Sequence, residues 1–196
     1  FWSRMQITRQ LEHMDFRHAR QTWKESGLSQ RAWHLSHARR ESVAMADSRA
    51  MLLLRDNLRN RNSIERAYRK AIAGAQSEVL IANAYFLPGG KLRRALVHAA
   101  KRGVKVRLLL QGRYEYFMQY HGARPVFGVL LAAGVEIHEY SVGFLHAKVA
   151  VVDGRWATVG SSNLDPLSLL LAREANVVVD DVPFAQSLRA RLLTAM

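Results

Sequence analysis

The chain has 196 residues, of which 49% are apolar and 23% are charged, and this balance excludes a disordered or low-complexity protein. It carries 29 Lys and Arg against 16 Asp and Glu, a formal charge of +13, so we expect an anionic partner such as nucleic acid, an acidic membrane surface or a phosphorylated substrate. The absence of cysteine excludes disulfides and thiolate chemistry, and no apolar run approaches the roughly 18 residues that span a bilayer, so any membrane contact is expected to be peripheral.

Residues 1–46 are predicted to form an N-terminal helical connector arm. They are rich in Arg, His, Gln and Trp, lack a strand pattern, and contain three of the four tryptophans. This composition indicates either a surface that touches lipid headgroups or nucleic acid, or aromatic rings that pack against a further domain, which we favour. Because the chain opens at Phe1 without a methionine, we expect it to be a piece of a longer protein.

Residues 47–196 alternate between strand and helix patterns. Apolar runs predict strands at residues 51–54, 78–85, 104–110 and 135–138. Periodic apolar positions predict helices that begin at Ser63, after Pro88-Gly89-Gly90 and at Pro125. Strands that alternate with helices predict an α/β domain around a parallel or mixed β-sheet.

Residues 145–163 are predicted to form a β-hairpin. Two strand-like runs flank Asp153-Gly154, a dipeptide that strongly favours a two-residue hairpin loop. With these residues as the loop, Val152 pairs with Arg155, and the register of the whole hairpin follows from that pair.

In this register, His146 lies across from Ser161 and Lys148 lies across from Val159. Side chains of facing residues, and of residues two apart on a strand, share one face. We therefore expect His146, Lys148, Ser161 and Asn163 to project together from the open end of the hairpin.

These side chains suit phosphoryl chemistry. A histidine acts as a nucleophile or as a general acid and base near neutral pH. Lysine, serine and asparagine bind the non-bridging oxygens of a phosphodiester. The sequence shows neither a pair of catalytic carboxylates nor a cluster of metal ligands, so no metal or cofactor is predicted, and Lys148 is the expected cation.

The whole string fits the pattern His-x-Lys-x4-Asp-x6-Gly-Ser-x-Asn, at His146, Lys148, Asp153, Gly160, Ser161 and Asn163. This pattern resembles the HKD motif of the phospholipase D superfamily. Glu174 follows Asn163 by eleven residues, where members of that family carry an acid that orients the motif histidine. Residues 47–196 also resemble the second half of bacterial cardiolipin synthases, the B-type enzymes most closely, in strings such as 81–88, 102–112 and 160–168.

The resemblance implies a phospholipase D-like catalytic domain with a mixed sheet flanked by helices over residues 47–196. It also implies a phosphatidyltransferase that makes cardiolipin from phosphatidylglycerol or another phospholipid donor. Family members bring two motifs to one site: one histidine forms a phosphohistidine, and the other protonates the leaving alcohol and deprotonates the acceptor. This sequence has one motif, so the second is expected from a missing N-terminal half or from a second copy.

By the same resemblance, His146 is the general acid and base, Lys148 neutralises phosphate charge, and Ser161 and Asn163 support the phosphate by hydrogen bonds. Asp153 belongs to the motif, but in the predicted register it sits in the turn, so we expect its role to be structural. The expected partner is anionic phospholipid, and the expected location is peripheral, on the cytoplasmic side of a bacterial cell membrane.

Two other function classes remain open. A protein with one motif also completes its site by pairing with a second copy, as in homodimeric phosphodiesterases and nucleases of the superfamily. In that class the positive charge serves a nucleic-acid backbone. The remaining class is a basic binding module whose hydrolytic site is incomplete and silent. Charge alone does not separate lipid from nucleic acid.

Overall fold

The computed structural model of the chain describes residues 44–45, 48–112 and 117–196. The chain divides into two units, residues 1–41 and residues 42–196, and only the second is described below. Apart from residues 44 and 45, the predicted helical arm lies outside the described residues, so its helices and its tryptophan surface stay predictions.

The described residues form eight strands and five helices. The strands are β1 (Ala44–Met45), β2 (Ser48–Arg55), β3 (Glu78–Asn83), β4 (Lys105–Gln111), β5 (Glu136–Tyr140), β6 (Lys148–Val152), β7 (Trp156–Gly160) and β8 (Glu174–Asp180). The helices are α4 (Ser63–Gly74), α5 (Gly90–Lys101), α6 (Phe117–Ala132), α7 (Pro166–Leu170) and α8 (Val182–Thr194).

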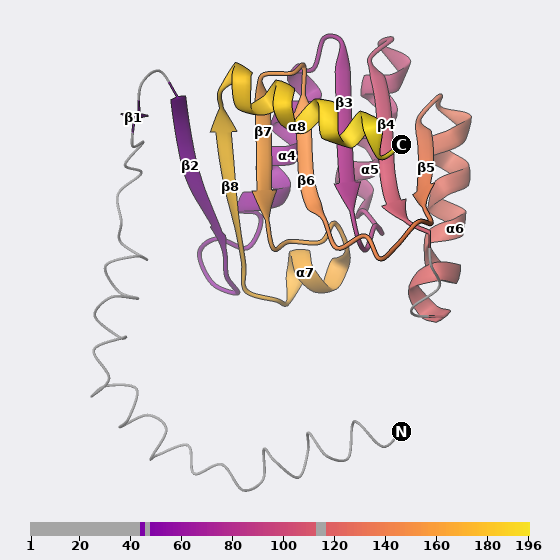
Figure 1. Cartoon of the computed structure of the whole chain (residues 1–196). Helices are drawn as coiled ribbons and strands as arrows, with labels where there is room; N and C mark the ends of the chain where they lie inside the picture. Colours follow the sequence, from indigo (N-terminus) through magenta and orange to yellow (C-terminus); the bar gives the residue numbers. More distant parts are fainter. Residues whose placement is uncertain (1–43, 46–47, 113–116) are drawn as a thin grey trace, which may run out of the picture. The chain divides into compact units, whose positions relative to one another are not determined.

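All eight strands belong to one mixed sheet, in the order β1-β2-β8-β7-β6-β3-β4-β5 (Figure 1). Neighbours β3, β4 and β5 run parallel, and the other neighbouring strands pair antiparallel. This arrangement confirms the α/β fold with a mixed sheet that the sequence predicts. It also pairs β2 with β8, two strands that the rest of the domain separates along the chain.

Helices cover both faces of this sheet. Helices α4 and α5 pack over one face, and α8 crosses the other face over β7, β6 and β3 (Figure 1). Strand β3 contributes Val79 and Ile81 to the first core and Leu80 and Ala82 to the second, because successive side chains alternate between the faces. A strand covered on both faces needs a continuous apolar run, which is what the sequence provides here.

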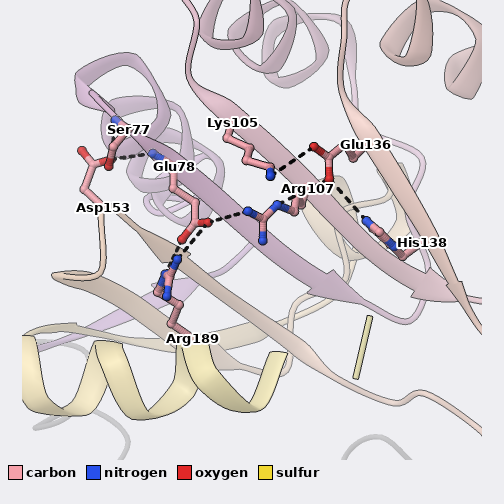
Figure 2. Close-up of polar contacts among 8 residues, drawn as sticks. All are labelled: Ser77, Glu78, Lys105, Arg107, Glu136, His138, Asp153 and Arg189. Carbon is pink, nitrogen blue, oxygen red and sulfur yellow. Dashed lines mark hydrogen bonds and ion pairs between the residues drawn. The ribbon is translucent and has the colours of Figure 1, made fainter. Parts of the chain in front are cut away.

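Ion pairs fasten α8 to the sheet at the end where β3, β4 and β5 begin (Figure 2). Glu78 is 8% exposed; its carboxylate pairs with Arg107 at 3.2 Å and with Arg189 of α8. Glu136 on β5 pairs with Arg107 at 3.4 Å and with Lys105 at 3.7 Å. A buried carboxylate is tolerated when it is paired, so these cations hold α8 and three strands together.

Candidate active site

The motif residues other than Asp153 lie at the opposite end of the sheet, which we call the site end. There β3 ends at Asn83, β6 begins at Lys148, β7 ends at Gly160 and β8 begins at Glu174. His146 precedes β6 by two residues and is exposed. Four strand ends therefore converge at this edge, as expected for a hairpin that carries its functional side chains at its open end.

The hairpin has a register one residue away from the predicted one. Asp153-Gly154 has the positive φ values, 51° and 60°, that a two-residue turn requires, and the carbonyl of Val152 accepts a hydrogen bond from the amide of Arg155 at 3.1 Å. Val152 nevertheless pairs with Trp156, so Arg155 is an extra residue on its strand. Arg155 also forms an exposed ion pair with Asp180 on β8, at 2.8 Å.

The shift corrects the predicted neighbours of Lys148. Val159 pairs with Val149, not with Lys148, and the same register carried one residue further places Lys148 across from Gly160. Carried on to residue 146, it places Ser162, not Ser161, across from His146. The observed register therefore does not support the prediction that His146, Lys148, Ser161 and Asn163 share one face of the hairpin. A Cβ atom on Gly160 would lie 2.3 Å from Oδ1 of Asn176 on β8. The motif glycine therefore leaves space for a buried asparagine on the neighbouring strand.

Lys148 is a buried cation, 7% exposed. Its Nζ donates to the carbonyl oxygen of His146 at 3.2 Å. Burial lowers the pKa of Lys148 below the usual lysine value, and the negative charges of Glu174 and Asp165 oppose that change. Since Coulombic attraction is stronger away from water, this ammonium group is well placed to attract a phosphate anion.

Ser161 and Glu174 form a hydrogen-bonded pair at the start of β8. The Ser161 hydroxyl donates to the Glu174 carboxylate and accepts from the amide of Ala175 at 3.1 Å. His146 and Ser161 both lie beyond the residues that pair in the hairpin, so these contacts, and not the predicted cross-strand pairing, hold Ser161 in place. The orientation of His146 by Glu174 stays a prediction.

Asn83 is a site-end residue that the sequence analysis missed. Its Oδ1 accepts from the amide of Leu164 at 3.1 Å. Directly after it, the amide of Ala84 donates to the carbonyl of Ala147 at 2.9 Å, and the amide of Leu87 donates to the carbonyl of Leu164 at 2.9 Å. The segment after β3 thus holds both arms of the motif. The available signal was an asparagine that closes a buried apolar strand.

Three buried polar atoms at the site end have no hydrogen-bond partner among the described residues. They are Nη2 of Arg55, Nδ2 of Asn83 and Oδ1 of Asn163, the last being on a motif residue. An unpaired buried donor or acceptor costs about 1–3 kcal/mol, so the site end retains hydrogen-bonding capacity that its own residues leave unused. The described residues contain no group of three or more His, Asp or Glu placed to bind a metal ion.

Asp153 lies at the far end of β6 from Lys148. Its carboxylate accepts hydrogen bonds from the backbone amides of Gln76, Ser77 and Glu78, each at 2.9 Å. Figure 2 shows the carboxylate beside Ser77 and Glu78. Burial acts to raise the pKa of Asp153, but these hydrogen bonds outweigh it and hold the pKa below its usual range. The contacts support the structural role expected for this motif residue.

The chain is similar to known sequences over most of its length. A family model described as "Cardiolipin synthase, PLD-like domain" matches residues 68–195. The chain is 46% identical to cardiolipin synthase B of Shigella flexneri over 164 residues, which are 84% of this chain and 40% of that protein. Identity to cardiolipin synthase B of Escherichia coli K12 is 45% over the same shares. The chain thus spans about two fifths of the length of these curated relatives.

Solved structures share the fold. Nuc from Salmonella typhimurium, a phospholipase D family member, superposes with a TM-score of 0.66 at 20% identity, covering 76% of this chain and 94% of that chain. Phosphatidylserine synthase from Haemophilus influenzae superposes with a TM-score of 0.59 at 16% identity, covering 76% of this chain and 39% of that chain. At these identities the similarity concerns the fold, and it confirms the phospholipase D-like architecture predicted from the motif.

Proposed function

We propose that this chain, which belongs to the PLD-like domain family of cardiolipin synthases, forms one half of a phosphatidyltransferase site. The reaction is the synthesis of cardiolipin from phosphatidylglycerol or another phospholipid donor. The observation that carries the proposal is the buried Lys148 directly beside His146 at the site end. A buried ammonium group that is bonded to the backbone of an exposed histidine is suited to a phosphodiester. It neutralises the single negative charge, and we expect the imidazole to transfer a proton.

In the proposed reaction, an imidazole nitrogen of one histidine attacks the phosphorus of the donor phosphatidylglycerol. The P–O bond to the departing glycerol breaks, and the second histidine gives its proton to that glycerol oxygen. The second histidine then takes a proton from a hydroxyl of another phosphatidylglycerol, whose oxygen attacks the phosphorus as the N–P bond breaks. Cardiolipin and glycerol leave, and both histidines return to their starting states.

The site-end contacts suggest the roles of the remaining residues. Lys148 offsets the charge on the non-bridging oxygens, and the Nδ2 group of Asn163 donates a hydrogen bond to an oxygen of the phosphate. The Ser161 hydroxyl donates to Glu174, which fixes the position of the carboxylate that we expect to orient His146. The structure supplies this set once, with His146 as the proposed general acid and base.

A second histidine has to come from another part of a longer protein or from a second copy of this chain. The homologous enzymes suggest the first source, because the chain matches only 40% of their length. The Nuc structure, covered over 94% of its chain, favours the second as the alternative: a homodimeric phosphodiesterase or nuclease that carries one motif in each copy. We place the enzyme peripherally at a membrane surface. No helix in the part of the chain that the structure describes is long and apolar enough to cross a bilayer.

Turnover of phosphatidylglycerol vesicles by the 196-residue chain tests the proposal. Cardiolipin formation is measured for the parent chain, for His146→Ala and for the matched control His98→Ala, an exposed histidine on α5, with the molar mass determined by light scattering. We expect cardiolipin from an assembled pair of sites, a loss of at least about a hundredfold in His146→Ala, and parent-like activity in His98→Ala.

The other outcomes have distinct meanings. A dimer that cleaves single-stranded DNA in a His146-dependent manner, and forms no cardiolipin, supports the nuclease alternative. If the chain is a folded monomer without turnover, the assay has to be repeated with the second half of the site added. Cardiolipin formation that survives His146→Ala contradicts the proposal.

A further inference from the structure

The four most exposed large apolar side chains among the described residues all lie in loops at the site end. They are Leu58, 84% exposed, Val142, 82%, Leu171, 65%, and Phe144, 64%. Single exposed apolar residues are normal on a protein surface. Here, however, the most exposed ones are concentrated around the end of the sheet that holds Lys148.

The topology explains why these loops share one edge. Leu58 follows the end of β2, Leu171 lies between α7 and β8, and Val142 and Phe144 lie between β5 and β6. The last residue of β2 pairs with the first residue of β8, so their loops leave the sheet together. In Figure 1 the loop after β2, helix α7 and the connection before β6 all lie at the lower end of the sheet.

The loop that carries Leu58 is held by its own hydrogen bonds. The Asp56 carboxylate accepts from the backbone amides of Leu58 and Arg59 at 2.8 Å and of Asn60 at 3.0 Å. Hydrogen bonds from Asn60 and Leu58 lower the pKa of Asp56 to about 2, so the carboxylate stays charged at neutral pH. The exposed leucine is therefore presented by an ordered turn.

A buried arginine joins this loop to the turn that carries Leu171. Arg55 is 2% exposed. Its Nε donates to the carbonyl of Leu169 at 3.2 Å, and its Nη1 donates to the carbonyl of Ala172. The two carbonyls flank Leu171, so the end of β2 and the turn before β8 form one supported surface.

Cations lie beside both leucines. Arg59 and Arg61 follow Leu58, Arg173 follows Leu171, and all three arginines are exposed. We call five residues of this surface the docking edge: Leu58, Arg59, Arg61, Leu171 and Arg173. They place apolar side chains next to positive charge. Such an arrangement matches the boundary of an anionic bilayer, where leucine enters the acyl region and arginine contacts lipid phosphates.

We propose that the docking edge binds an anionic phospholipid bilayer and thereby presents the site end to lipid headgroups. This inference rests on the proposed function, since a phosphatidyltransferase has to reach a phosphate held at the membrane surface. The positive charge argues for an anionic occupant, because three exposed arginines beside two exposed leucines complement a surface that offers phosphates next to acyl chains. Binding of a second copy or of the other half of the site to this edge is an alternative outcome of the test.

Sedimentation with vesicles tests the docking edge without any turnover. The 196-residue chain is mixed with vesicles of phosphatidylglycerol and phosphatidylethanolamine, and with vesicles of phosphatidylcholine alone. The double variant Leu58→Gln/Leu171→Gln is compared with Leu131→Gln, a 54% exposed leucine on α6 at the opposite end of the sheet. Arg59→Gln is compared with Arg49→Gln, an exposed arginine at the far end of β2.

We expect binding to the anionic vesicles, about a tenfold fall in partition for the double leucine variant and about a fivefold fall for Arg59→Gln. The two control variants bind like the parent chain, and His146→Ala also binds like the parent chain. Thermal unfolding of each variant checks that the fold is kept.

Parent-like vesicle binding by the double leucine variant overturns the proposal. If this variant, with vesicle binding intact, also has a lower molar mass by light scattering, the edge is a contact between protein chains instead. If the docking edge controls vesicle binding while cardiolipin formation survives His146→Ala, the proposed function fails and the docking edge stands. If turnover depends on His146 and the variants still bind vesicles, only the docking edge fails.

Discussion

The two ends of the sheet differ in how their polar groups are paired. At the end where β3 begins, Glu78 pairs with two arginines and the Asp153 carboxylate accepts hydrogen bonds from three consecutive backbone amides. At the site end, Lys148 is buried and donates to one backbone carbonyl, while Arg55, Asn83 and Asn163 each keep a buried polar atom without a hydrogen-bond partner among the described residues. At the other end Arg107 Nε also lacks a hydrogen bond, but it lies 3.4 Å from the Glu136 carboxylate.

The difference suggests that motif residues at the two ends of the hairpin have different roles, one in stability and one in ligand binding. The hairpin that carries the motif extends from one end of the sheet to the other, so Asp153 and Lys148 belong to the same pattern but to different environments. Polar groups that are paired internally stabilise the fold, whereas groups left unpaired are available to a ligand. We therefore expect substitutions at the two ends to separate stability from activity.

Lys148→Met is expected to have the largest effect on activity. Removal of the buried cation leaves the phosphate charge without its main counterpart, so turnover of phosphatidylglycerol falls by about a hundredfold or more. Stability changes little, because the protein no longer buries an ammonium group whose pKa burial already lowers. Lys105→Met at the opposite end, half-exposed and paired with Glu136, is the matched control and keeps parent-like turnover. Equal loss in both variants contradicts the division between the two ends.

Asp153→Ala is expected to show the reverse pattern. The variant loses the acceptor for the amides of Gln76, Ser77 and Glu78, which lowers the free energy of unfolding by about 2 kcal/mol. Turnover per folded molecule stays close to that of the parent. Chemical denaturation and vesicle turnover at a temperature where both proteins are folded check the two parts. An unchanged melting temperature with abolished turnover would refute the structural role.

Gly160→Ala is expected to destabilise the protein by about 1–2 kcal/mol. The added Cβ atom would lie 2.3 Å from Oδ1 of Asn176 and 2.5 Å from the carbonyl oxygen of Ala175, so both the side chain and the backbone of β8 have to move. Gly74→Ala is the control, since a Cβ atom there meets nothing within 4 Å. Thermal unfolding of the two variants makes the comparison, and equal melting temperatures would contradict the predicted crowding.

Lowering the pH is expected to have the smallest effect on the free energy of unfolding. The pKa of Asp56 is lowered to about 2 and that of Asp153 is lowered from its usual value. A carboxylate with a depressed pKa in the folded state stabilises the protein above its unfolded pKa, and this contribution is lost as the pH falls through the folded value. The free energy of unfolding should therefore decline from about pH 4 toward pH 2. Denaturant titrations across this range should show a shallower decline in Asp56→Ala and in Asp153→Ala.

Much of the fold follows from local patterns in the sequence. The apolar run of β3 and the helices after it predict a mixed α/β sheet, because each pattern depends on neighbours along the chain. Helix α6 begins at Phe117 with Pro125 inside it, whereas the proline suggested a start at residue 125. The pairing of β2 with β8 was not predictable in this way, since it depends on residues more than a hundred positions apart.

The candidate site, like the fold, was predictable where the signal is local and not where it depends on long-range contacts. The motif identifies His146, Lys148, Ser161 and Asn163 as candidates, but their arrangement depends on contacts that are distant in sequence. The strand that follows the turn also pairs with β8, a distant part of the chain, and a turn rule alone gives the wrong register. The contact of Asn83 with Leu164 spans 81 residues, and no local pattern reports it.

A crystal structure of the chain with tungstate, a mimic of the phosphate group, tests the central claim most directly. The site end is predicted to bind the oxyanion, with tungstate oxygens within hydrogen-bonding distance of Nζ of Lys148 and of the Asn163 side chain. Soaking the Lys148→Met variant should abolish that density. Tungstate bound instead beside Asp153 and the arginines around Glu78, with none at Lys148, would contradict the assignment of the phosphate site to this end of the sheet.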